Sequence, residues 1–275
     1  MGPLAAGRFR LDLSRPLVMG VVNVTPDSFS DGGKFFDTKV AVAHALRLAE
    51  EGADILDIGG ESSRPGALPV SVSEELDRIL PVLEGLKRVD KPLSIDTRRP
   101  EVMQAALRAG ASMINDIEAL QAPGALEAVA KSQCAVCLMH MKGQPATMQQ
   151  EPHYDDVVGE VRHFLDERAR ACERAGVARE RIVLDPGFGF GKTPAHNFEL
   201  LRRLKEFSSL KLPILAGWSR KSTLGKLTGR PADERLAASL ATALLALQGG
   251  ATMLRVHDVK ETRDVIAVWQ AYRHE

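Results

Sequence analysis

One pattern recurs eight times along the chain: a short apolar run, a polar joint that often contains glycine, and a longer amphipathic stretch. The apolar runs have the length of buried strands, and the amphipathic stretches have helical periodicity. The predicted strands are 17–22, 53–58, 92–95, 112–114, 134–139, 182–184, 213–216 and 252–256. The predicted helices are 40–51, 74–88, 100–109, 125–132, 155–175, 198–207, 234–248 and 261–272.

Eight strand–helix units with right-handed crossovers close most economically as a (β/α)8 TIM barrel, which is an α/β fold. An open, doubly wound sheet is the alternative. Barrels of about 250 residues form one domain, and no linker or charge block divides this chain of 275 residues. The pattern therefore predicts a single domain over residues 1–275.

The charges of the chain balance, with 36 basic and 36 acidic side chains. No overall field therefore favours nucleic acid or an anionic membrane, whereas a small charged substrate suits the sequence. No apolar run is long enough to span a membrane, and the N-terminus lacks the apolar segment of a signal peptide. Cys134, Cys137 and Cys172 fit as small core residues in a reducing compartment. We expect a soluble, cytoplasmic protein.

Catalytic groups of such barrels lie at the C-terminal ends of the strands. Nearly every predicted strand ends in a group that ionises or forms hydrogen bonds. Each one alone has a structural interpretation as a turn or capping residue, as Ser71 with Glu74 fits a capping box. Their succession along one rim favours a functional site. The groups are Asn23, residues 59–66 and 96–98, Asn115, Asp116, His140, Asp185, residues 217–222, His257 and Asp258.

Asp96, Asn115 and Asp185 form a first subset of acceptor groups. Carboxylates accept paired N–H bonds from an amino-pyrimidinone edge, so this subset suits a donor-rich heterocycle. The same residues could hold a divalent metal or perform acid–base work, and their spacing alone does not choose. Zinc is disfavoured, because the histidines are scattered and form no zinc motif.

Arg220, Lys221, Arg255 and His257 form a second, cationic subset. Arg255 and His257 are two residues apart on a strand and therefore share a face. The loops after the last two strands commonly bind phosphate in barrels. These cations therefore favour a phosphate site, to which Arg64 could contribute, although a basic rim without function is the alternative.

Residues 187–193 imitate a nucleotide phosphate loop. The Walker pattern requires glycine where this chain has Pro186, so we reject a nucleotide site. Phe190 in this segment is better interpreted as an apolar wall at the rim.

Eight motifs in this order resemble the dihydropteroate synthase family: NVTPDSFSDGG, DIGGESSRPGA, IDTRRPE, NDI, CLMHMKG, LDPGFGFGK, GWSRKS and RVHDVKET. The resemblance runs from about Arg15 to the last helix. It implies a (β/α)8 barrel enzyme that condenses 6-hydroxymethyl-7,8-dihydropterin diphosphate with 4-aminobenzoate. The products would be 7,8-dihydropteroate and diphosphate.

The resemblance also implies ligands for individual residues. The pterin residues would be Asp96, Asn115, Asp185 and Lys221, with Met139 and Phe190 as apolar neighbours. The diphosphate residues would be Asn23, Arg255 and His257, and Asn23 would also bind the cofactor Mg²⁺. The aminobenzoate residues would be Phe29, Ser63, Arg64, Pro65, Lys221 and Ser222.

The implied mechanism is loss of diphosphate to give a cationic pterin methylene, which the arylamine then attacks. The residues implied in catalysis are Asp27, Asp31, Arg64, Lys221, Arg255 and His257. The loop over residues 23–33 would act as a lid, in which Gly32 and Gly33 allow movement. The implied partners are small molecules and a second copy of the chain, since the family is usually homodimeric, with no nucleic acid and no membrane.

One position departs from the commonest family pattern, because Ser63 stands where threonine usually precedes the arginine. We expect activity to survive this loss of a methyl group, with an effect on aminobenzoate affinity or sulfonamide discrimination. Two other functions compete. A methyltransferase acting between methyltetrahydrofolate and a corrinoid protein leaves the Arg255 and His257 pair unexplained. A non-catalytic pterin-binding paralogue predicts broken motifs.

Overall fold

The computed structural model describes residues 2–24, 34–62, 69–145 and 147–273. Eight parallel strands form one sheet in the order β8-β7-β6-β5-β4-β3-β10-β9. The edge strands meet through a bridge between Leu184 and Ile214, and the Leu184 N–H donates to the Pro213 carbonyl at 2.9 Å. The sheet thus closes as a (β/α)8 barrel, as predicted. Its strands are β3 (Leu17–Asn23), β4 (Ile55–Gly59), β5 (Leu93–Asp96), β6 (Met113–Asp116), β7 (Ala135–Met139), β8 (Ile182–Asp185), β9 (Leu215–Ala216) and β10 (Met253–Val256).

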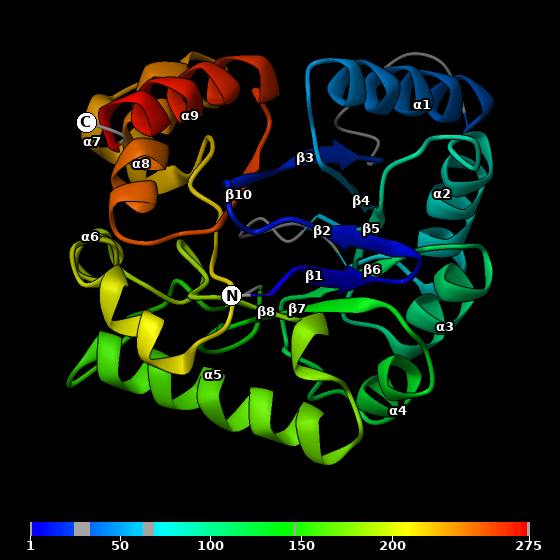
Figure 1. Ribbon diagram of the computed structural model, residues 1–275, viewed down its shortest axis with the longest axis horizontal. Coiled ribbons are helices and arrows are strands. Elements are labelled where there is room, and N and C mark those ends of the chain that lie inside the picture. Colours follow the sequence, from blue (N-terminus) through cyan, green and yellow to red (C-terminus); the bar gives the residue numbers. More distant parts are fainter. Residues whose placement is uncertain (1, 25–33, 63–68, 146, 274–275) are drawn as a thin grey trace.

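Helices surround the barrel (Figure 1). Each predicted helix overlaps an observed one, and the Ser71–Glu74 capping box is present at the start of α2 (Val72–Gly85). The predicted helix 198–207 is wrong in one respect, because Arg203 leaves helical geometry and separates α6 (Pro194–Arg202) from the 3-10 helix η3 (Leu204–Leu210). Helix α7 was not predicted. The helices are α1 (Lys34–Glu50), α2 (Val72–Gly85), α3 (Pro100–Arg108), α4 (Ala125–Ala130), α5 (Val157–Arg174), α6 (Pro194–Arg202), α7 (Ser222–Thr228), α8 (Leu236–Gln248) and α9 (Val259–Arg273), with short 3-10 turns η2 (Arg179–Arg181) and η4 (Ala232–Glu234).

An N-terminal hairpin, which the periodicity did not reveal, covers the N-terminal end of the barrel (Figure 1). Strands β1 (Leu4–Ala6) and β2 (Phe9–Leu11) pair antiparallel. Leu4 and Ala6 are buried against an inner apolar layer. This layer consists of Leu17, Met19, Ile55, Met113, Ala135, Cys137, Val183, Leu215 and Met253. The N-terminal half of the barrel, which we call the lower half, is therefore a packed core. This leaves the C-terminal, upper half to hold a ligand.

The cysteines lie where the sequence predicted. Cys137 belongs to the inner apolar layer, while Cys134 packs in the outer core between strands and helices. Cys172 is also in the outer core, and all three are free and buried. Within the described residues, no helix combines the length and the apolar character needed to cross a membrane.

Candidate active site

A layer of polar side chains lies directly above the inner apolar layer. Alternate residues of a strand share a face, so Ile55 in the apolar layer is followed by Asp57, and Met253 by Arg255. The same step of two leads from Met113 to Asn115 on β6. We call this set the polar layer. It consists of Asp57, Asp96, Asn115, Asp185 and Arg255.

The guanidinium of Arg255 joins two carboxylates of the polar layer. Its Nε donates to Oδ2 of Asp57 at 2.6 Å, and its Nη2 donates to Oδ2 of Asp96 at 2.6 Å. Nδ2 of Asn115 donates to the same Oδ2 of Asp57 at 3.1 Å. The Asp57 side chain is fully buried, while those of Asp96 and Arg255 are 16% and 20% exposed. Two carboxylates thus share one cation in a poorly solvated place.

Burial sets the protonation of the polar layer. It raises the pKa of Asp96 to about 7; the carboxylates of Asp57 and Glu75 add to the rise, and Arg255 and Lys221 oppose it. Burial also raises the pKa of Asp185, although the Gly187 N–H donates to its Oδ1 at 2.7 Å and opposes that shift. N–H donors of a ligand would favour the ionised form of these two carboxylates.

An apolar wall with a cation stands beside the polar layer. Phe190 packs with Met139, Ile117 and Met148 in a separate buried cluster. The ammonium of Lys221 lies 4.1 Å from the centre of the Phe190 ring, which is a cation–π contact. The structure therefore brings together Met139, Phe190 and Lys221, as the resemblance implied.

Lys192 is a buried cation that our sequence interpretation overlooked. Its ammonium contacts Nδ1 of His140 at 3.0 Å and the carbonyls of Gly187 and Phe190 at 2.9 and 3.0 Å. Burial lowers the pKa of Lys192 to about 7. Burial and the charge of Lys192 lower the pKa of His140 to about 2, so this imidazole is neutral and accepts the bond. The loops after β7 and β8 are thereby joined beneath Phe190.

Gly187 explains how closely these two loops approach. Its φ is +70°, and a Cβ at this position would lie 1.9 Å from the carbonyl oxygen of His140. No other residue fits there without moving the loop. Gly187, in the segment that imitates a phosphate loop, thus serves close packing.

The cationic turn after β9 is held by contacts with the segment that follows β10. Ser219 Oγ lies 2.9 Å from Nδ1 of His257, and it accepts the His257 backbone N–H at 3.2 Å. Arg220 forms an ion pair with Asp258. This predicted cation is therefore engaged by the carboxylate of Asp258, which follows β10. Lys221 follows as the residue before α7, and Ser222 begins that helix.

The predicted site residues divide into two groups. The described residues lie around the C-terminal end of the barrel, which we call the mouth. Asn23 ends β3 and pairs in register with Gly59, which in turn pairs in register with Asp96. Asp57 was not among the predicted site residues, although a carboxylate inside an apolar strand could have pointed to it. Six predicted residues lie outside the described part of the chain: Asp27, Phe29, Asp31, Ser63, Arg64 and Pro65.

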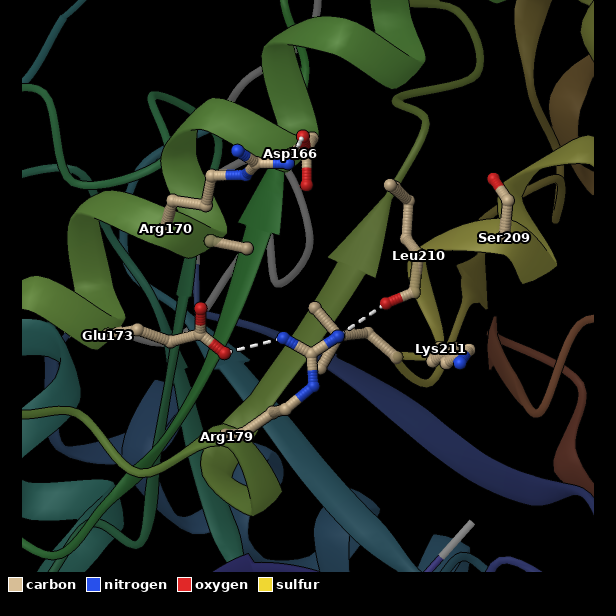
Figure 2. A pocket seen from close by; sticks show the side chains of 9 residues that line it. Asp166, Arg170, Glu173, Arg179, Ser209, Leu210 and Lys211 are labelled. Atoms are coloured by element: carbon tan, nitrogen blue, oxygen red, sulfur yellow. Dashed lines mark hydrogen bonds and ion pairs between the residues drawn. The ribbon is translucent and has the colours of Figure 1, made fainter.

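A cavity of about 300 Å³ lies away from the mouth, between α5 and η3 on the outside of the barrel. Figure 2 shows Arg179 directed at both Glu173 and the Leu210 carbonyl. Arg170 pairs with Asp166 at 2.8 Å. Because its arginines are already engaged with neighbouring residues, we assign no substrate to this cavity.

Comparisons with known proteins identify the family of the chain. A family described as pterin binding enzyme matches residues 19–257. Dihydropteroate synthase of Escherichia coli (strain K12) is 53% identical over 262 residues, 95% of this chain and 93% of that protein. Dihydropteroate synthase of Xanthomonas albilineans with 4-aminobenzoic acid has a TM-score of 0.93 at 55% identity, covering 99% of both chains. The Burkholderia cenocepacia enzyme complexed with 7,8-dihydropteroate has a TM-score of 0.91 at 50% identity, covering 99% of this chain and 97% of that one. The chain therefore belongs to the pterin-binding enzyme family and, within it, to the dihydropteroate synthases.

Proposed function

We propose that the mouth of the barrel is where this dihydropteroate synthase condenses 6-hydroxymethyl-7,8-dihydropterin diphosphate with 4-aminobenzoate. One observation carries the assignment: buried or partly buried acceptors and partly buried cations meet at the same end of the barrel. Asp96, Asn115 and Asp185 supply the acceptors, while Arg255 and Lys221 supply the cations. A substrate that carries a donor-rich ring and an anionic tail matches both.

The pterin ring suits the acceptor side. Its amino group and ring N–H groups are donors, and a carboxylate accepts two such bonds in parallel. Asp185 and Asp96 would take these donors, with Met139 and Phe190 against the ring. The Burkholderia cenocepacia enzyme, complexed with 7,8-dihydropteroate, supports a pterin in this fold.

The diphosphate suits the cationic side, where Arg255, His257 and Asn23 would hold it. Mg²⁺ takes oxygen ligands and is often bound by few protein groups together with substrate phosphates. The residues fit that mode, because Asn23 offers an amide oxygen at the end of β3, next to the strand that carries Arg255. Bound Mg²⁺ would offset negative charge on the leaving group.

The reaction needs no protein nucleophile. The C–O bond to diphosphate breaks and its electron pair leaves with the phosphate oxygen; the arylamine lone pair then forms the C–N bond and a proton is released. Asp96 and Asp185 would offset the positive charge on the pterin methylene, and Arg255 and His257 the charge on the diphosphate. Roles around the aminobenzoate for Phe29, Ser63, Arg64, Pro65 and Ser222 rest on the family resemblance. Asp27 and Asp31 would bring negative charge toward the transient cation, and this role rests on the resemblance too.

We also propose a cytoplasmic homodimer. Helices α7, α8 and α9 lie together (Figure 1). They expose large apolar side chains that a second copy could cover, among them Leu227, Val268 and Tyr272 at 69%, 68% and 74% exposure. Light scattering would test this, with Leu227→Asp expected to shift the mass toward one chain. Free, buried cysteines support a reducing compartment.

The test of the activity is direct. Purified protein, pterin diphosphate, Mg²⁺ and labelled 4-aminobenzoate should yield labelled dihydropteroate. Arg170→Ala, in the outer cavity of Figure 2, should keep full activity, whereas Arg255→Ala should lose it. Pterin binding without product would instead support a non-catalytic binding protein.

A further inference from the structure

Asp57 is a buried carboxylate that the proposed reaction does not use. It lies within β4, and its side chain is fully buried. Oδ2 accepts both from Arg255 and from Asn115. Oδ1 has no hydrogen-bond partner among the described residues. A buried carboxylate with one unpaired oxygen costs stability, which points to a role other than packing.

Asp57 fixes the orientation of the Asn115 amide. An amide presents donors on one side and an acceptor on the other, and an ionised carboxylate only accepts. The 3.1 Å contact with Asp57 therefore fixes the NH₂ group of Asn115 on the Asp57 side. The amide oxygen is left for other partners, and it can only accept. Asn115 thereby presents the same polarity as Asp96, its neighbour in register.

Asp57 also anchors Arg255. Its guanidinium is held at two points, by Asp57 through Nε and by Asp96 through Nη2. In the proposed complex Asp96 also serves the pterin ring. Asp57 supplies the anchor that does not depend on the substrate, so the guanidinium stays in place when ligand donors approach Asp96.

We propose that Asp57 is a positioning residue that sets substrate selectivity. It turns the Asn115 oxygen toward the ligand and anchors Arg255, so that the mouth selects ligands whose ring edge carries N–H donors. This inference rests on the proposed function, because it deepens the recognition of the same ring. Asp57 acts through Asn115 and Arg255 and does not need to touch the substrate.

The test compares two probes by calorimetry: 6-hydroxymethylpterin, and a 2,4-diaminopteridine analogue in which the ring N–H donor is replaced by an acceptor nitrogen and the 4-oxo acceptor by an amino donor. Wild-type protein should prefer the pterin. In Asp57→Asn, the Asn115 amide is free to turn over, so the ratio of the two affinities should fall by about tenfold, the size of one hydrogen bond to a charged group. The KM for pterin diphosphate should rise while that for 4-aminobenzoate changes little.

Two further variants make the result decisive. The swap Asp57→Asn with Asn115→Asp restores a donor facing a carboxylate, and it should recover most of the selectivity. Ser94→Ala removes a buried hydroxyl beside Asp57 in register, and it should leave the ratio unchanged. If Asp57→Asn weakens both probes equally, or if the swap does not restore the ratio, Asp57 is only a structural residue and the inference is overturned.

These outcomes are separable from the activity itself. Wild-type protein that fails to bind 6-hydroxymethylpterin would overturn the proposed function. Wild-type protein that binds it and makes dihydropteroate, with an unaltered ratio in Asp57→Asn, would overturn only the role of Asp57.

Discussion

The ammonium of Lys192 lies 3.0 Å from Nδ1 of His140, and both side chains are buried. The groups within hydrogen-bonding distance are acceptors, including the carbonyls of Gly187 and Phe190. This single side chain therefore joins the loop after β7 to the loop after β8. The second loop carries Phe190, over which the Lys221 ammonium lies.

Lys192→Met should leave these acceptors buried without a donor. We expect the free energy of unfolding to fall by about 2–4 kcal/mol, since each unpaired buried group costs about 1–3 kcal/mol. Urea denaturation measures this change, and Lys205→Met on the exposed face is the control. The KM for pterin diphosphate should rise as Phe190 loses its support. A variant as stable as wild type would show that Lys192 does not hold the loops.

Asp96 should make both stability and pterin affinity depend on pH. Its folded pKa of about 7 lies above the ordinary value of 3.8 for an aspartate, so the folded state binds more protons between these limits. Its contribution to stability therefore declines as pH rises from about 4 to about 7. Pterin affinity should increase over the upper part of this window, because the ionised carboxylate is the better acceptor.

Calorimetry of 6-hydroxymethylpterin across this pH range tests the expectation. The groups that act on Asp96 are Asp57, Glu75, Arg255 and Lys221, so they must be kept intact. Asp96→Asn should bind more weakly and lose the pH dependence. An unchanged pH profile in that variant would assign the titration to another group.

Asp185→Asn should mainly weaken pterin binding, because the amide replaces a two-oxygen acceptor by one oxygen and a donor. We expect a loss of about tenfold or more in affinity. Asp166→Asn, in the outer cavity, is the matched control, since Asp166 pairs with Arg170 far from the mouth. Equal pterin affinity for wild type and Asp185→Asn would refute the assignment.

Removal of divalent metal should separate turnover from ring binding. EDTA should suppress product formation but leave the affinity for 6-hydroxymethylpterin unchanged, because that probe has no diphosphate. Asn23→Ala should raise the Mg²⁺ concentration that gives half-maximal activity. Full turnover in EDTA would remove the proposed role of Asn23.

The sequence predicted the barrel and most of the mouth for a physical reason. Buried parallel strands leave continuous apolar runs, and the polar residue that ends such a run must lie at one rim. Asp96, Asn115 and Asp185 were accessible to this argument. Asp57 was not, because it lies inside a strand and its role arises from Arg255, which is far away in the sequence.

Other features were missed because they depend on short elements or on tertiary contacts. Strands β1 and β2 have three residues each, too few to show periodicity. The role of Lys192 depends on His140 and on a loop crossing that no local pattern records. Gly187 was visible, but its purpose emerges only from the nearby His140 carbonyl.

The hairpin that covers the lower end of the barrel also constrains how the chain is made. The Gly7 N–H donates to the carbonyl of Gln133, and β3 pairs with β10 near the other end of the chain. A ribosome therefore delivers the first elements long before their partners. Until translation finishes, β3 has an unpaired apolar edge, which is the kind of surface that chaperones protect. The same long-range contacts that close the lower end of the finished barrel leave an apolar strand edge of the nascent chain open to aggregation until β10 is made.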